Sequence, residues 1–311
     1  MVPAEHGTGR DADAPAHSQG EAGRARTRDG RELYYQWLPG PVGPDGARPT
    51  VVFEGGLAAG RSYWAGAQAA LADVAPTVVY DRSGLGRSPA APAGVSRRLP
   101  ALAEDLGDLL DHLERVGPGG PFLLVGHSWG GPLVRLAAAA QPARVAGLVL
   151  VDPTDESCDL LFQPAMRRAE RIGQLVTVAL ARLGLLGLLG RAYRSLTATL
   201  PPDAAADMRA EGYTVAMTRT RGRELEDAAG DLRALLENPP GLAGLPVTVV
   251  SAGRVSPGMP KSVRERATAS HAYRARQSPH GRHVVLPEAD HMVLTTSAAE
   301  LAEEIRRLAV V

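Results

Sequence analysis

Residues 121–140 read PFLLVGHSWGGPLVRLAAAA and place a G-x-S-x-G pattern between two different secondary-structure signals. The apolar run before the pattern is typical of a buried β-strand, and the leucine- and alanine-rich run after it is typical of a helix. On such a sharp turn the small glycines let neighbouring backbone approach closely, and the serine hydroxyl stays accessible as a nucleophile. Pro132 fits the first helical turn, where a missing N–H costs little. The pattern therefore predicts that Ser128 is a nucleophile.

The order of the other elements predicts an α/β fold with a doubly wound, mostly parallel sheet. Helical patterns lie between several of the expected strands, as in residues 99–116, where leucines recur at helical spacing. Residues 28–30 indicate a hairpin turn that leads into an early strand at 33–37. Alternating strands and helices favour a parallel sheet covered on both faces. The runs typical of buried strands are residues 51–53, 77–80, 122–125, 148–151, 247–250 and 283–286.

With this elbow pattern in its strand-turn-helix setting, the chain resembles the α/β-hydrolase superfamily from about Arg24 to the C-terminus. The resemblance implies a catalytic serine, acid and histidine in that chain order, with an oxyanion hole of backbone N–H groups. It also implies a helical cap inserted between the sixth and seventh strands. The expected organisation is a disordered tail at 1–23, a hydrolase core at 24–152 and 241–311, and a cap at 153–240.

His291 is the predicted general base. It follows a strand-like run and the turn 288–290, and it precedes an expected helix at 297–308. The superfamily places its catalytic histidine in the loop after the last strand, so the resemblance assigns this role to His291. His127, which precedes the serine, is expected to pack within the turn. The remaining candidates, His271, His280 and His283, flank a positively charged stretch that we expect to be rich in loops.

The predicted acid is Asp152, which directly follows the apolar run 148–151. The superfamily most often carries the acid after the seventh strand, but residues 251–264 of this chain contain no carboxylate. Some members place the acid after the sixth strand, where Asp152 stands and where it could hold the tautomer of the His291 ring. Alternatively, Asp152 only caps the turn that follows it. Asp155 is a second candidate for the acid, and a damaged, non-hydrolytic triad is also open.

The oxyanion hole requires two backbone N–H donors directed at a developing negative charge. Trp129, the residue after the nucleophile, is expected to supply one donor. The loop after the strand 51–53 is expected to supply the other, and we assign it to Leu57, with Gly56 as the neighbour that could replace it. Related enzymes often have a His-Gly pair in this loop, whereas this chain has Glu54-Gly55-Gly56.

The expected cap contains an unusually apolar stretch at residues 172–189. Packing on the core is the expectation for most of its side chains, and the remainder would line a hydrophobic pocket. A membrane-spanning helix needs about 20 mostly apolar residues, and Arg182 and several glycines interrupt this stretch. We therefore expect no membrane insertion.

Composition limits the other classes of function. The 311 residues have a formal net charge of zero, so no basic field is expected to draw nucleic acid or a membrane surface. Of the 34 cationic residues only Lys261 is a lysine, a bias that composition alone could explain. The single cysteine, Cys158, excludes an intramolecular disulfide and a cysteine-rich metal site. We expect no metal or cofactor, and a cytoplasmic location is expected because residues 1–23 contain no apolar run typical of a secretory signal.

These observations predict a metal-free serine hydrolase that acts on a small to medium, apolar ester, thioester or lactone, with an amide as a weaker candidate. A lyase, a cyclase or a C–C bond hydrolase could use the same triad, and the motifs do not separate them. A non-catalytic ligand receptor on the same scaffold would usually lose the nucleophile or the base. Haloalkane dehalogenases and epoxide hydrolases need an aspartate where this chain has Ser128. The oligomeric state stays unknown.

Overall fold

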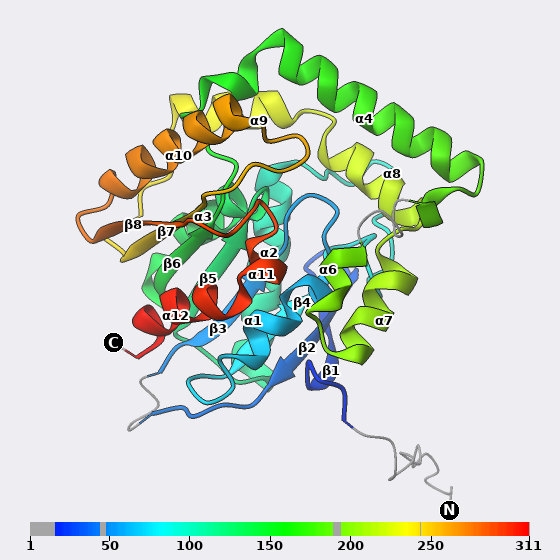
Figure 1. Ribbon diagram of the computed structural model, residues 1–311. Helices are drawn as coiled ribbons and strands as arrows, with labels where there is room; N and C mark the ends of the chain where they lie inside the picture. Colours follow the sequence, from blue (N-terminus) through cyan, green and yellow to red (C-terminus); the bar gives the residue numbers. More distant parts are fainter. Residues whose placement is uncertain (1–15, 44–47, 189–193, 243, 311) are drawn as a thin grey trace, which may run out of the picture.

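The computed structural model describes residues 16–43, 48–188, 194–242 and 244–310. Its centre is an eight-stranded sheet with helices on both faces (Figure 1). The strand order is β1-β2-β4-β3-β5-β6-β7-β8, and all neighbouring strands from β4 to β8 run parallel. Only the hairpin β1–β2 and its junction with β4 are antiparallel. The predicted doubly wound, mostly parallel α/β sheet is confirmed.

Each predicted strand is present, β4 with the predicted bounds and the others extended by one or more residues, and β1 is an additional strand. The strands are β1 (Glu21–Arg26), β2 (Glu32–Leu38), β3 (Thr50–Glu54), β4 (Thr77–Tyr80), β5 (Phe122–His127), β6 (Val145–Val151), β7 (Val247–Ala252) and β8 (Gly281–Leu286). The helices that flank the sheet are α1 (Ala65–Ala69), α2 (Leu99–Val116), α3 (Gly130–Ala140), α10 (Lys261–Arg276), α11 (Val293–Thr296) and α12 (Ala298–Ala309). Between β6 and β7 lie α4 (Pro164–Arg182), α6 (Arg194–Ala198), α7 (Pro202–Glu211), α8 (Val215–Glu224) and α9 (Ala228–Glu237).

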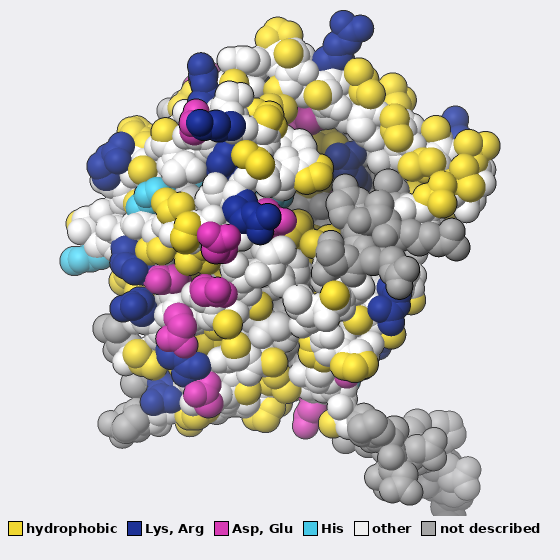
Figure 2. Space-filling view, viewed as in Figure 1, with side chains coloured by type: hydrophobic (Ala, Val, Ile, Leu, Met, Phe, Trp, Pro, Cys, Tyr) yellow, Lys and Arg dark blue, Asp and Glu magenta, His cyan; other side chains and the backbone are white. Residues whose placement is uncertain are grey.

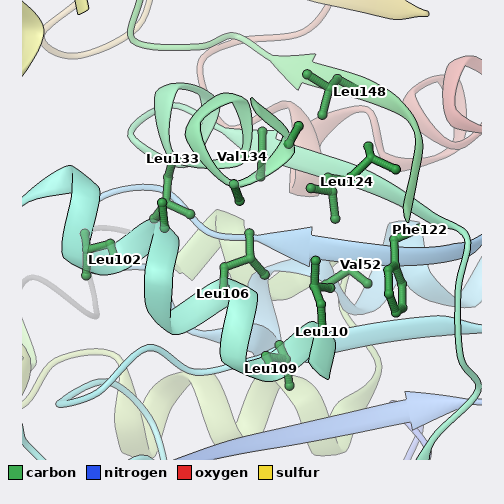
Figure 3. Packing of buried hydrophobic residues seen from close by; sticks show 14 of the residues in the cluster. Val52, Leu102, Leu106, Leu109, Leu110, Phe122, Leu124, Leu133, Val134 and Leu148 are labelled. Atoms are coloured by element: carbon green, nitrogen blue, oxygen red, sulfur yellow. The ribbon is translucent and has the colours of Figure 1, made fainter. Parts of the chain in front are cut away.

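The central strands are buried on both faces, which explains why their sequences are continuous apolar runs rather than alternating ones. Along β3, Val52 belongs to one core cluster, whereas Val51 and Phe53 belong to the other. The first cluster packs against α2 and α3 (Figure 3), and the second packs against α1, α11 and α12. The sheet is therefore held between two helical layers.

Buried ion pairs join the helices between β6 and β7 to the core. Arg61, which is fully buried, contacts Asp81 after β4 and Asp207 and Glu211 on α7. A second buried arginine, Arg82, joins the same edge of the core to α8. In Figure 1, α4, α8 and α9 lie above the sheet, and α6 and α7 lie beside α1.

The apolar stretch of α4 does not pack on the core, contrary to the expectation from its sequence. The side chains of Ile172, Leu175 and Val176 are 52%, 67% and 52% exposed, and Leu183 beyond the helix end is 70% exposed. Hydrophobic side chains are accordingly visible along α4 in Figure 2. The physical reason is that α4 packs mainly against α8 and arches away from the sheet. Within the described ranges, no helix is long and apolar enough to cross a membrane.

The expectation of a disordered tail at residues 1–23 is wrong for the last residues of that segment. β1 begins at Glu21 and pairs with β2, and Gln19 is fully buried. Its side-chain amide donates to the Arg61 carbonyl at 3.1 Å, and Ser18 donates to Asp203 on α7. These polar anchors order a segment that has few apolar residues. Residues 1–15 lie outside the described ranges.

The core packing of α2 generates a stability prediction. Leu106 is fully buried between α2 and the sheet, so Leu106→Ala should lower the free energy of unfolding by about 2–5 kcal/mol. Val116→Ala, at the exposed end of the same helix, is the matched control and should change it by less than about 0.5 kcal/mol. Urea unfolding of the three proteins measures both effects. Equal losses for the two variants would contradict the assigned core.

Candidate active site

Ser128 stands on a sharp turn between β5 and α3, as the sequence predicts. Its φ of 51° lies in the left-handed region, which few residues other than glycine adopt. Gly126 and Gly130 permit this turn, because a Cβ atom on Gly126 would collide with the Gly130 carbonyl oxygen. Among the described residues, nothing hydrogen-bonds to the Ser128 hydroxyl. The turn therefore leaves the hydroxyl without a partner among the described residues, as the predicted nucleophile requires.

Asp152 directly follows β6, just as Ser128 directly follows the neighbouring strand β5. The last residues of β5 and β6, His127 and Val151, are partners in the parallel register, so Ser128 and Asp152 are each the next residue. The Ser128 N–H donates to the Val151 carbonyl at 3.0 Å. Asp152 also has a positive φ, 41°. Two adjacent strands thus deliver the two side chains to the same edge of the sheet.

His291 meets Asp152 from the loop after β8. Its Nδ1 lies 2.6 Å from Asp152 Oδ2, and the carboxylate is almost fully buried while the imidazole is 31% exposed. A carboxylate can only accept, so Nδ1 carries the proton and donates it. Nε2 is then left unprotonated and able to take a proton.

The second carboxylate oxygen of Asp152 is held by α10 and by the end of β7. Arg264 Nη1 lies 2.5 Å from Oδ1, and the backbone N–H of Ala252 donates to the same oxygen at 3.1 Å. Burial opposes ionisation of Asp152, but the hydrogen bond from His291 and the nearby positive charge outweigh it. The pKa of Asp152 is therefore well below its usual range. Asp152 is held as an anion.

Sequence reasoning missed this role of α10. The charged stretch near His271 was expected to be loop-rich, but it forms a regular helix, and His271 is buried 3.8 Å from Asp152. His271 Nε2 donates to the Pro153 carbonyl at 2.8 Å, and its Nδ1 accepts from the Ser251 hydroxyl at 2.7 Å. Alanine and arginine are good helix formers, and their frequency here was the signal that could have found the helix.

Asp155, the second candidate for the acid, does not contact His291. It is buried and pairs with Arg274 on α10, with Nε 2.7 Å from Oδ2. Asp152 is the carboxylate that the structure brings to His291.

His127 packs within the turn, as expected. Its Nε2 donates to the backbone carbonyl of His291 at 2.8 Å, and the two rings lie 4.9 Å apart. Burial, with a smaller contribution from the charge of His291, lowers the pKa of His127 to about 3. A neutral His127 therefore joins the loop of His291 to the turn of Ser128.

The loop after β3 lies directly against this turn. A Cβ atom on Gly56 would stand 3.2 Å from the Cβ of Ser128, so the loop approaches closely at that point. Neither the Leu57 N–H nor the Trp129 N–H donates a hydrogen bond to a described residue. The structure thus leaves both predicted oxyanion donors without an acceptor. Their role stays a prediction.

Two other site predictions concern metals and the cysteine. Within the described ranges, no group of three or more His, Cys, Asp or Glu side chains could hold a metal ion. Cys158 is buried and free, and burial raises the pKa of its thiol. A raised pKa disfavours the thiolate, so Cys158 is a weaker candidate for the nucleophile than Ser128.

Comparison with known families places the fold. A family model described as the alpha/beta hydrolase fold matches residues 49–298. Lipase LipV of Mycobacterium tuberculosis is 43% identical over 79 residues, which cover 25% of this chain and 27% of the lipase. The chain spans less than half the length of each curated relative it matches.

Solved structures resemble most of the chain. The match to a thermophilic esterase from Thermogutta terrifontis covers 93% of this chain and 97% of the esterase chain. Its TM-score is 0.61 and the sequence identity is 19%. A candidate epoxide hydrolase from Pseudomonas aeruginosa covers 96% of this chain, with 100% of its own length, a TM-score of 0.71 and 17% identity. At these identities the likeness shows the fold alone.

The environment of His127 generates a prediction about pH. Because its folded pKa lies below the ordinary value of 6.5, its contribution to stability is complete above that pH and is lost as the pH falls toward 3. The imidazole signals of His127 in NMR spectra should therefore stay those of a neutral ring from about pH 8 to about pH 5. Comparison with a His127→Gln variant assigns the signals. An inflection of these signals near pH 6.5 would show that burial does not control this ring.

Proposed function

The chain belongs to the α/β-hydrolase family, and we propose that it is a serine hydrolase with Ser128, His291 and Asp152 as its catalytic triad. The observation that carries the proposal is the 2.6 Å contact between His291 Nδ1 and Asp152 Oδ2 beside the strained turn of Ser128. A buried anionic acid, an imidazole in a defined tautomer and an accessible serine hydroxyl are the parts of an acyl-transfer site.

In the proposed mechanism Ser128 Oγ attacks the carbonyl carbon of the substrate while His291 Nε2 takes the hydroxyl proton. The Leu57 and Trp129 N–H groups donate to the oxyanion of the tetrahedral intermediate. The imidazolium then gives its proton to the leaving oxygen or sulfur as that bond breaks. Water, deprotonated by His291, releases the acid from Ser128 by the reverse sequence. Asp152 stabilises the imidazolium in both halves of the reaction.

We propose an ester, thioester or lactone of a small to medium, apolar molecule as the substrate. The name of the lipase among the similar proteins supports ester-type chemistry. We further propose that residues 153–240 act as a cap over the site. The buried ion pairs that attach α7 and α8 to the loops after β3 and β4 support this role.

The nucleophile is tested by covalent labelling. A fluorophosphonate probe should add one label to the wild-type protein, and peptide mapping should locate it on Ser128. Ser128→Ala should abolish the label and lower turnover of a p-nitrophenyl ester by about 10⁴–10⁶, because residual catalysis comes from binding and the oxyanion hole. Undiminished labelling of Ser128→Ala would refute the assignment.

The acid is tested by Asp152→Asn, which should lower ester turnover by about 10⁴ because the amide leaves His291 in the wrong tautomer. Glu265→Gln is the matched control, since this exposed carboxylate on α10 lies outside the site, and it should retain turnover within about twofold. Circular dichroism confirms that each variant is folded. Near-normal turnover of folded Asp152→Asn would remove Asp152 from the triad.

A further inference from the structure

We propose that Arg82 is a positioning residue that sets the orientation of the oxyanion loop, and that Glu224 makes this orientation depend on helix α8. The oxyanion loop is defined here as residues 54–58. The inference rests on the proposed function and names a residue that the triad does not include. It also gives a role to Glu54, which accepts from Arg82.

Arg82 follows β4 and binds the backbone of the oxyanion loop. Its Nη1 donates to the Gly55 carbonyl at 2.8 Å, and its Nη2 donates to the Gly56 carbonyl at 2.8 Å. The Gly56 carbonyl also accepts from the Ala59 N–H at 3.1 Å, which closes a turn with Ala58 at a φ of 58°. The guanidinium therefore fixes two consecutive peptide planes of this loop.

The position of a carbonyl determines where the N–H of the same peptide points. In a planar trans peptide the C=O and N–H bonds point in opposite directions. Because the Gly56 carbonyl points to Arg82, the Leu57 N–H points away from Arg82. A Cβ atom on Gly56 would lie 3.2 Å from the Ser128 Cβ, and the Leu57 N–H has no acceptor among the described residues. Holding the Gly56 carbonyl therefore fixes the direction of the proposed Leu57 donor, which lies in a loop that contacts the Ser128 turn.

Arg82 itself is rigidly held. Its side chain is 2% exposed, and Glu224 accepts from Nε and Nη2 at 2.9 Å each. Glu54 accepts from Nη1, and the Tyr80 hydroxyl donates to the same carboxylate. All five N–H groups of the guanidinium are thereby used, two of them on the loop carbonyls. A lysine has three donors without this planar arrangement and could not make the same set of contacts.

Glu224 connects this arrangement to the proposed cap. It is the last residue of α8, where the helix dipole disfavours a negative charge, and it is 1% exposed. Positive charge from Arg82 and Arg97 compensates for that position. A displacement of α8 would move Glu224, and with it the arginine that holds the loop.

Arg97 provides a matched control. It is also buried, at 3% exposure, and belongs to the same charge network, with Nη1 2.8 Å from Asp105 and Nη2 3.7 Å from Glu224. It makes no contact with the loop carbonyls. A residue that acts only on stability should behave like Arg97, whereas a positioning residue should change the transition state.

The experiment compares Arg82→Lys with Arg97→Lys in the full chain. Arg82→Lys should lower kcat for a p-nitrophenyl ester about 10²-fold with KM within about threefold, as expected when an oxyanion donor is misplaced. The Kd of an alkyl boronic acid, whose tetrahedral adduct places an oxygen in the oxyanion hole, should rise by a similar factor. Arg97→Lys should change kcat and Kd by less than about threefold. Equal changes in the two variants would overturn the inference.

Amide hydrogen exchange of a peptide covering residues 54–58 gives a readout that needs no activity. Exchange should accelerate in Arg82→Lys and not in Arg97→Lys, and unchanged exchange in Arg82→Lys would also overturn the inference. If Arg82→Lys does not fold, Glu224→Gln is measured in its place, with a loss of about tenfold in kcat expected. A wild-type protein that neither labels nor hydrolyses esters refutes the proposed function, and the exchange result then decides the role of Arg82 alone.

Discussion

The close approach of backbone at Gly130 is the constraint on which the site depends. A Cβ atom there would lie 2.7 Å from the carbonyl oxygens of Glu54 and Gly55, so only glycine lets the loop after β3 rest on the start of α3. The same glycine faces Gly126 across the turn of Ser128. One residue without a side chain therefore allows both the strained serine and its neighbouring loop, and larger residues would separate them.

Ion pairs between buried arginines and carboxylates recur in this structure. Arg61, Arg82 and Arg264 are all nearly inaccessible, and each contacts a carboxylate near the carboxyl ends of the strands. Burying a charge is costly unless it is paired and hydrogen-bonded, and the planar guanidinium can satisfy several acceptors at once, as that of Arg82 does. The scarcity of lysine, which composition alone could explain, therefore coincides with a structural use of arginine at these positions.

Sequence reasoning predicted the fold well because the strands are long apolar runs and the turn at Ser128 has its own signature. It also selected Asp152 and His291, because apolar runs locate the strand ends and the resemblance to the α/β-hydrolase superfamily places the acid and the histidine after particular strands. It could not find Arg264, because no local pattern shows that a helix from residue 261 will place one arginine on the acid. It also misjudged Ile172 and its neighbours on α4, because amphipathic periodicity does not reveal whether a helix face meets the core. Contacts between segments that are distant in the sequence determine both the placement of Arg264 and the exposure of the α4 side chains.

The position of the proposed acid, Asp152, directly after β6 has a consequence for how the protein can vary. Ser128 and Asp152 follow partnered residues of adjacent parallel strands, so the sheet's hydrogen-bond ladder sets their separation, independently of any loop length. β7 contributes the backbone N–H of Ala252, its last residue, to Asp152, and α10, which follows β7, contributes Arg264. Residues 254–260, which lie between these two contacts and are mostly exposed, make no hydrogen bond to Asp152. Insertions or exchanges there could reshape the surface of the protein during evolution while the carboxylate and the serine keep their spacing.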